Sequence, residues 1–135
     1  MISKDCSNWW NDYIGLPFVE KGRDERGFDC WGLVRHIYIN RLDIYLPSYS
    51  ESYEKVTDYS AVSEKIKKES EQWLLVDSPK EYDVILLRVN GLPMHVGIIT
   101  RPNHMLHCML NVGVIHEKYT GLRWKDKVLG YGRCK

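Results

Sequence analysis

Long apolar runs are missing from this sequence. None approaches the roughly 18 consecutive residues that a membrane-spanning helix requires. The opening stretch, "MISKDCSNWWNDYIG", also lacks the continuous apolar core that follows the lysine of a secretion signal. We therefore expect a protein that does not insert into a membrane and carries no secretion address of its own.

An excess of charge of one sign is also missing. The chain has 19 Lys and Arg against 18 Asp and Glu, which leaves a formal net charge of +1. Binding to a nucleic acid needs a basic stripe, so we expect no nucleic-acid partner. The four cysteines are scattered without a CxxC pair, which predicts reduced thiols rather than a disulfide framework or a zinc ribbon: Cys6, Cys30, Cys108 and Cys134.

What is present fits one globular unit. The 135 residues are 44% hydrophobic and 27% charged, which is enough apolar surface for a single core. Repeats, low-complexity tracts and linkers are absent, so we predict one domain spanning residues 1–135.

The first half of the chain has the spacing of helices. We predict a short helix over Ser3–Tyr13, ended by a glycine and a proline, and a more exposed helix over residues 57–72. Between them, apolar residues recur at intervals of three and four from Cys30 to Leu42, which indicates a helix with one face on a core. Asp29 is placed to cap that helix.

The second half has the pattern of strands. From Trp73 onward, short β-rich runs alternate with turn signals such as Asp-Ser-Pro and Asn-Gly. An antiparallel meander is the simplest interpretation. Helices followed by consecutive hairpins predict an α+β fold, with the helices packed on one face of an antiparallel sheet.

The start of the predicted central helix is a candidate reaction centre. If Asp29 caps the helix, Cys30 lies in its first turn, where unpaired N–H groups and the helix dipole favour a thiolate. The same N–H groups can stabilise the negative oxygen that forms when a thiolate attacks a carbonyl. One helix end could thus supply a nucleophile and part of an oxyanion hole.

A thiol nucleophile needs a base, and the predicted strands offer one. His95 shares a strand face with Gly97, a small residue that lets another element approach closely. A three-residue loop over residues 101–103 would place His95 opposite Met109 and diagonal to His107. His107 would then be within reach of the His95 ring.

Structural roles compete with these assignments. A lone cysteine in an apolar helix is more often core than nucleophile, and this interpretation is kept for the other three cysteines. The remaining histidines are assigned to the surface, to a turn or to satisfied polar positions: His36, His104 and His116. A zinc site of His104, His107, Cys108 and another thiol is disfavoured, because adjacent strand residues point to opposite faces.

The motifs taken together resemble a known family. "GFDCWGLV", "HVGI" and "MLHC" are similar to the Asp-Cys-(Ser)-Gly-Leu-Val, His-Val-Gly-Ile and Met-Ile-His-Ala motifs of the NlpC/P60 family of papain-like cysteine peptidases. By this resemblance Cys30 is the nucleophile, His95 the general base and acid, and His107 the residue that orients His95. The resemblance implies no metal or organic cofactor.

The resemblance also suggests residues that contact substrate. It implies Asp29, Trp31 and Tyr13, although Trp31 stands where bacterial cell-wall members carry a serine. The substrate implied is a peptidoglycan stem peptide, cut between D-glutamate, through its γ-carboxyl group, and diaminopimelate. Acyl transfer or another amidase reaction on the same fold stays open, because catalytic residues do not disclose the acceptor.

A more specific likeness is to NlpC/P60 domains of long-tailed bacteriophages. "DCWGLVRHIY" and "LPSYSESY" resemble the motifs of that subgroup. The resemblance implies phage tail tip proteins as partners and a place in the virion, after synthesis in the host cytoplasm, with action at the bacterial cell wall. The alternative is a catalytically silent structural component of the tail tip or tail assembly.

Overall fold

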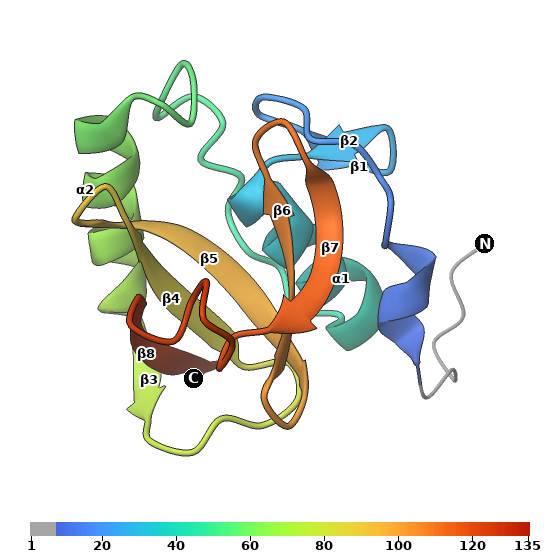
Figure 1. Cartoon of the computed structure of the whole chain (residues 1–135). Coiled ribbons are helices and arrows are strands. Elements are labelled where there is room, and N and C mark those ends of the chain that lie inside the picture. Colours follow the sequence, from blue (N-terminus) through green and yellow to red (C-terminus); the bar gives the residue numbers. More distant parts are fainter. Residues whose placement is uncertain (1–7) are drawn as a thin grey trace.

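A computed structural model describes residues 8–135, and it confirms the α+β fold (Figure 1). The described residues begin with a 3-10 helix and a two-stranded hairpin, continue with two α-helices and end in six strands. In chain order the elements are η1 (Trp9–Asp12), β1 (Arg23–Asp24), β2 (Gly27–Phe28), α1 (Cys30–Leu42), α2 (Tyr59–Ser70), β3 (Trp73–Val76), β4 (Val84–Val89), β5 (Leu92–Arg101), β6 (His104–Met109), β7 (Gly113–Lys118) and β8 (Val128–Cys134).

The six later strands form one antiparallel sheet in the order β3-β8-β4-β5-β6-β7. The meander prediction is confirmed for β4 to β7, which pair consecutively. It is wrong for β8, which returns across the sheet to lie between β3 and β4. Turn signals specify hairpins between neighbours in sequence, whereas this insertion depends on pairing between distant segments.

Helix α1 packs on one face of this sheet. Its buried side chains join those of β4, β5 and β6 in the larger core, which includes Leu33, Val34, Ile37, Val84, Val96, Ile98, Leu106 and Cys108. A Cβ atom on Gly32 would lie 1.9 Å from the carbonyl oxygen of Gly22. The second position after Cys30 therefore has to be glycine, because the β1–β2 hairpin crosses the helix there.

The opposite face of the sheet carries a smaller core. Its buried members are Ile85, Leu87, Ile99, Met105, Tyr119 and Trp124. The last two come from the segment between β7 and β8, which folds back over this face.

Helix α2, green in Figure 1, contacts β5 and packs Val62 and Ile66 inward, with Ile66 against the larger core.

The N-terminal prediction holds only in part. Of the helix expected over Ser3–Tyr13, residues 3–7 lie outside the described part of the chain, and the remainder is the single 3-10 turn η1. The segment between η1 and α1, for which no element was predicted, contains the β1–β2 hairpin. Within residues 8–135, the structure has no helix long and apolar enough to cross a membrane.

Candidate active site

The amino end of α1 is built as the sequence predicts. Asp29 has an extended backbone conformation, and its Oδ1 accepts a hydrogen bond of 2.8 Å from the N–H of Gly32. This contact satisfies one of the free N–H groups of the first helical turn and fixes where the helix begins. Cys30 is consequently the first residue of α1.

The environment of the Cys30 thiol differs from the expectation of a thiolate. The residue is 7% exposed, and burial, with a smaller contribution from the Asp29 carboxylate, raises the pKa of Cys30 to about 12. Main-chain hydrogen bonds at Val96 and Trp31 act in the opposite direction on this pKa but are the weaker effect. The resting residue is therefore a neutral thiol whose sulfur lies against the main chain of Val96, the residue after His95.

His95 and His107 contact each other, as the predicted register required. Ile98 pairs with Leu106, and continuing this register back along β5 leaves His95 diagonal to His107. The two rings meet through His95 Nε2 and His107 Nδ1, 2.8 Å apart. The turn itself is tighter than expected, since Arg101 pairs with His104 after a register shift.

Gly97 makes this contact possible. A Cβ atom at position 97 would lie 3.1 Å from the Cβ of His107 and 3.2 Å from the carbonyl oxygen of Leu106. The glycine predicted that another element approaches closely here, and that element is strand β6 at His107. A side chain at position 97 would require the Cβ of His107, and with it the ring that supports His95, to shift by a few tenths of an ångström.

Sequence reasoning missed a third member of this chain of contacts. Glu117 on β7 places its Oε2 2.6 Å from His107 Nε2 and accepts a 3.1 Å hydrogen bond from Trp124 Nε1. The Trp124 ring also stacks on His95, with ring centroids 5.7 Å apart and an interplanar angle of 12°. Period-two spacing on β7 was the available signal, but it does not single out one polar residue among several.

Burial favours the neutral form of both histidines at rest. It lowers the pKa of His95 to about 3, helped by its neighbour His107, while Glu117 acts in the opposite direction. Burial likewise lowers the pKa of His107 to about 3, with a further contribution from Arg123. The resting site is therefore a neutral thiol beside a neutral imidazole, and proton transfer belongs to the reaction itself.

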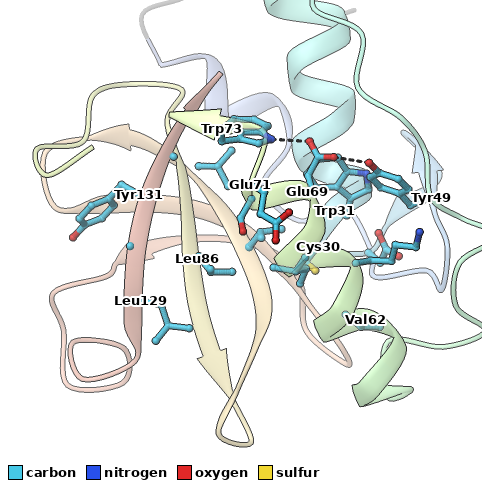
Figure 2. Close-up of a pocket in the computed structure, with 18 of the residues that line it drawn as sticks. Cys30, Trp31, Tyr49, Val62, Glu69, Glu71, Trp73, Leu86, Leu129 and Tyr131 are labelled. Carbon is cyan, nitrogen blue, oxygen red and sulfur yellow. Dashed lines mark hydrogen bonds between the residues drawn. The ribbon is translucent and has the colours of Figure 1, made fainter. Parts of the chain in front are cut away.

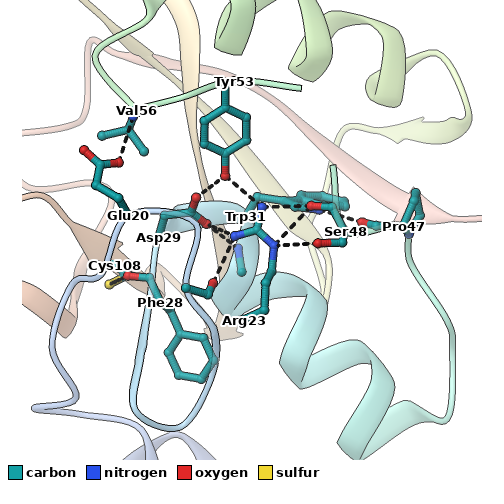
Figure 3. Close-up of polar contacts among 12 residues, drawn as sticks. Glu20, Arg23, Phe28, Asp29, Trp31, Pro47, Ser48, Tyr53, Val56 and Cys108 are labelled. Atoms are coloured by element: carbon teal, nitrogen blue, oxygen red, sulfur yellow. Dashed lines mark hydrogen bonds and ion pairs between the residues drawn. The ribbon is translucent and has the colours of Figure 1, made fainter. Parts of the chain in front are cut away.

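Asp29 is engaged entirely within the protein (Figure 3). Besides capping Gly32, its Oδ1 pairs with Arg23 at 2.8 Å, and its Oδ2 accepts a hydrogen bond from the Tyr53 hydroxyl. Arg23 continues to the hydroxyl of Tyr53 at 2.7 Å and to the carbonyl oxygen of Ser48. Asp29 lines the larger of the two cavities described below but is fully buried, so direct contact of its carboxylate with a substrate would require one of these partners to move.

The other two residues suggested for substrate contact differ in position. Trp31 is half-buried beside the cavity described below, and its Nε1 donates to the carbonyl oxygen of Pro47 at 2.9 Å. Tyr13 is fully buried and lines neither of the two cavities at Cys30. The structure thus gives no support to a substrate role for Tyr13, whereas Tyr53 lies at Asp29 beside Cys30.

Two cavities meet at Cys30. The larger, of about 410 Å³, lies between α2 and the β3-β8-β4 part of the sheet, and most of its lining is apolar (Figure 2). Glu69 in its wall accepts hydrogen bonds of 2.6 Å from both Tyr49 and Trp73. The smaller cavity, of about 280 Å³, contains Cys30, His95 and Trp124.

This arrangement suits attack on a carbonyl group with substrate on both sides. The thiol faces two openings, and the imidazole in the smaller one can accept its proton. The N–H of Gly32 is already used by Asp29 and that of Trp31 by the Cys30 sulfur, so the N–H of Cys30 itself is the first-turn donor left for a developing oxyanion. Across residues 8–135 there is no group of three or more side chains suited to a metal, and Cys108 donates instead to the carbonyl oxygen of Phe28.

Comparison with known proteins agrees with this geometry. The model of the family described as NlpC/P60 matches residues 15–133. A probable endopeptidase of Haemophilus influenzae is 25% identical over 126 residues, covering 92% of this chain and 67% of that protein. The murein DD-endopeptidase MepS/murein LD-carboxypeptidase of Escherichia coli is 24% identical over 116 residues, covering 86% of this chain and 54% of that protein.

Solved structures share the fold. A crystal structure of an NlpC/P60 family protein from Bacillus cereus superposes with a TM-score of 0.70 at 20% identity, covering 98% of this chain and 41% of that one. The chain thus spans between about two fifths and two thirds of these three relatives.

Proposed function

The chain belongs to the NlpC/P60 family of cysteine peptidases, and on this premise we propose that it hydrolyses an amide bond in peptidoglycan stem peptides. The bond proposed joins D-glutamate, through its γ-carboxyl group, to diaminopimelate. The Escherichia coli relative is named for acting on murein, which supports this class of substrate.

One observation carries the proposal. The sulfur of Cys30, at the amino end of α1, lies against the main chain of Val96, and the adjacent His95 is held by His107 at 2.8 Å. Nucleophile and base thus line one cavity, and the orienting group contacts the base from the neighbouring strand β6. This is the set of roles that thiol-dependent acyl transfer requires.

The proposed reaction follows from these positions. His95 accepts the thiol proton as the sulfur of Cys30 forms a bond to the amide carbonyl, and helix N–H groups stabilise the oxyanion. The C–N bond then breaks as His95 returns the proton to the leaving amine. Water, deprotonated by His95, hydrolyses the thioester and regenerates the thiol.

The test is digestion of purified peptidoglycan sacculi, with the released fragments identified by mass spectrometry. The native chain should release fragments of defined mass, and Cys30→Ala and His95→Ala should release none while remaining folded. Cys134→Ala serves as the matched control, because this free cysteine is only partly buried and lines neither cavity. Cleavage by Cys30→Ala, or no cleavage by the native chain on walls of several chemotypes, would refute the proposal.

A place in the phage tail tip is the finer part of the proposal. The supporting observation is that the two stretches typical of the phage subgroup contact each other here. Trp31 donates to the carbonyl oxygen of Pro47 and Arg35 to that of Leu46, each at 2.9 Å, so the helix holds the Leu-Pro loop. In this proposal the protein is made in the host cytoplasm, is carried in the virion with other tail tip proteins and acts at the bacterial cell wall.

Particle composition tests this location. Mass spectrometry of purified virions of the encoding phage should detect the chain, and detergent-dissociated tails should yield it together with tail tip proteins. Its absence from washed particles, combined with its presence in the infected cell, would refute the location without affecting the reaction.

A specific observation also favours a second candidate, a catalytically silent component of the same tail tip. Cys30 is buried and its pKa is raised to about 12, which is the opposite of an exposed, activated thiol. For this candidate, native particles and particles carrying Cys30→Ala should infect equally well. A defect in Cys30→Ala particles that assemble normally would exclude it.

A further inference from the structure

Glu117 has no role in the reaction proposed for Cys30 and His95, although it contacts His107. On β7 it pairs with Met105, two residues from the Ile115–His107 pair, so it is the diagonal neighbour of His107 on the same sheet face. Its Oε2 lies 2.6 Å from His107 Nε2 and 3.1 Å from Trp124 Nε1. Its Oε1 lies 3.9 Å from the guanidinium of Arg123.

The contacts of Glu117 determine the protonation pattern of both rings. An ionised carboxylate only accepts hydrogen bonds, so the proton of neutral His107 must be on Nε2. His107 Nδ1 is then a lone pair, and it can accept only if His95 carries its proton on Nε2. The remaining nitrogen of neutral His95, Nδ1, is therefore unprotonated and able to act as a base.

We propose that Glu117 is a positioning residue, which acts through His107 to hold His95 in the tautomer that can accept the proton of Cys30. This inference rests on the proposed cysteine peptidase reaction, although its structural part can be tested without substrate. Glu117 also supplies a negative charge at the far end of the relay. That charge stabilises the imidazolium that forms when the proton leaves the thiol.

The two hydrogen-bonded histidine rings can carry their protons in either of two patterns, and the Glu117 carboxylate favours the one described. If an N–H group faced His107 Nε2, the ring would protonate Nδ1 instead and donate to His95 Nε2. His95 would then carry its proton on Nδ1, where it cannot accept another while neutral. Glu117→Gln offers either an oxygen or an N–H group in nearly the same volume, so it should populate both patterns.

The first test is the tautomeric state of the histidines, read from ¹⁵N chemical shifts and long-range ¹H–¹⁵N couplings in histidine-labelled protein at pH 7.5. Native protein should show both His95 and His107 protonated on Nε2. Glu117→Gln should show mixed tautomers at both rings, and so should Glu117→Leu, which offers no polar group. Lys118→Gln is the matched control, because it removes an exposed charge from the neighbouring residue and should leave both tautomers unchanged.

The second test is kinetic. Glu117→Gln should lower kcat on the order of 10²-fold, less than the roughly 10⁴-fold that follows loss of the aspartate in a Ser-His-Asp triad, because here the effect passes through one more ring. KM should stay within about twofold, since Glu117 lines neither cavity. The decrease in kcat should persist across pH 6 to 9, because a changed tautomer is not restored by a changed pH.

The outcomes separate this inference from the proposed function. Native protein with His95 protonated on Nδ1 overturns the inference, whether or not the variants fold. Folded Glu117 variants with native tautomers and native kcat also overturn it, while cleavage by the native chain would still stand. Altered tautomers in a chain that cuts no peptidoglycan would support the positioning role of Glu117 and refute the proposed substrate.

Discussion

The resting charge of Cys30 gives a prediction with a defined magnitude. A thiol with a pKa of about 12 is ionised about 3000-fold less at pH 7.5 than a free thiol with a pKa of about 8.5. The more basic thiolate is also the better nucleophile, which recovers about 40-fold at a Brønsted coefficient of about 0.45. Iodoacetamide should therefore alkylate Cys30 on the order of 100-fold more slowly than free cysteine.

The assay follows the modification of Cys30 by peptide mass spectrometry from pH 6 to pH 10, with free cysteine in the same tube as the reference. The logarithm of the rate should rise with pH over the whole range, without a plateau near neutrality. His95→Ala should change the rate by no more than a few-fold, because a neutral imidazole does not ionise the resting thiol.

The contrary result is equally clear. Alkylation faster than that of free cysteine, with a plateau below pH 7 that His95→Ala abolishes, would show a preformed thiolate–imidazolium pair. The argument that burial outweighs the helix end would then be wrong.

Three further predictions concern the same site. Because burial lowers the pKa values of His95 and His107 to about 3 in the folded state, the unfolded chain binds protons that the folded one does not, and the contribution of these two histidines to stability should be constant above about pH 6.5. It should fall as the pH decreases from 6.5 toward 3, by up to about 1.4 kcal/mol per histidine per pH unit, and equal urea midpoints at pH 7 and pH 5 would contradict this. Gly97→Ala should destabilise the protein by about 1–3 kcal/mol in urea unfolding and lower kcat, since the added Cβ meets His107, and an unchanged midpoint would count against that contact. Arg23→Ala should lower the free energy of unfolding by about 3–5 kcal/mol, because the Asp29 carboxylate would be left buried without its cation. Arg23→Ala combined with Asp29→Asn should recover part of that loss. A double variant no more stable than Arg23→Ala would argue against the charge as the cause.

Local signals were enough to predict the parts of the site that lie close together in sequence. Helix α1 and its cap at Asp29 follow from a capping residue and a regular apolar spacing within one segment. The contact between His95 and His107 follows from the register of one hairpin. Both kinds of signal involve residues within about a dozen positions, where chain geometry restricts the alternatives.

Contacts that depend on how several elements pack together could not be predicted in this way, even where the partners lie close in sequence. Tyr53 and Arg23 lie 24 and six residues from Asp29, yet they meet it because a loop and a hairpin pack over the same helix end. Glu117 reaches His107 through the pairing of β6 with β7, and Trp124 reaches both Glu117 and His95 because its segment folds back over the sheet. Other Glu, Arg, Tyr and Trp residues of the chain look the same in the sequence, so the sequence does not indicate which of them reach the site.

The pKa of Cys30 shows most clearly what depends on the local sequence and what depends on the tertiary structure. The sequence by itself determined that a cysteine begins a capped helix, and a helix end stabilises a negative charge by at most about 2 kcal/mol. Only the tertiary structure decided that this cysteine is buried, and raising its pKa from 9.0 to about 12 corresponds to about 4 kcal/mol in the opposite direction. Burial wins because desolvation depends on everything packed around the thiol, whereas the helix end acts from one direction alone.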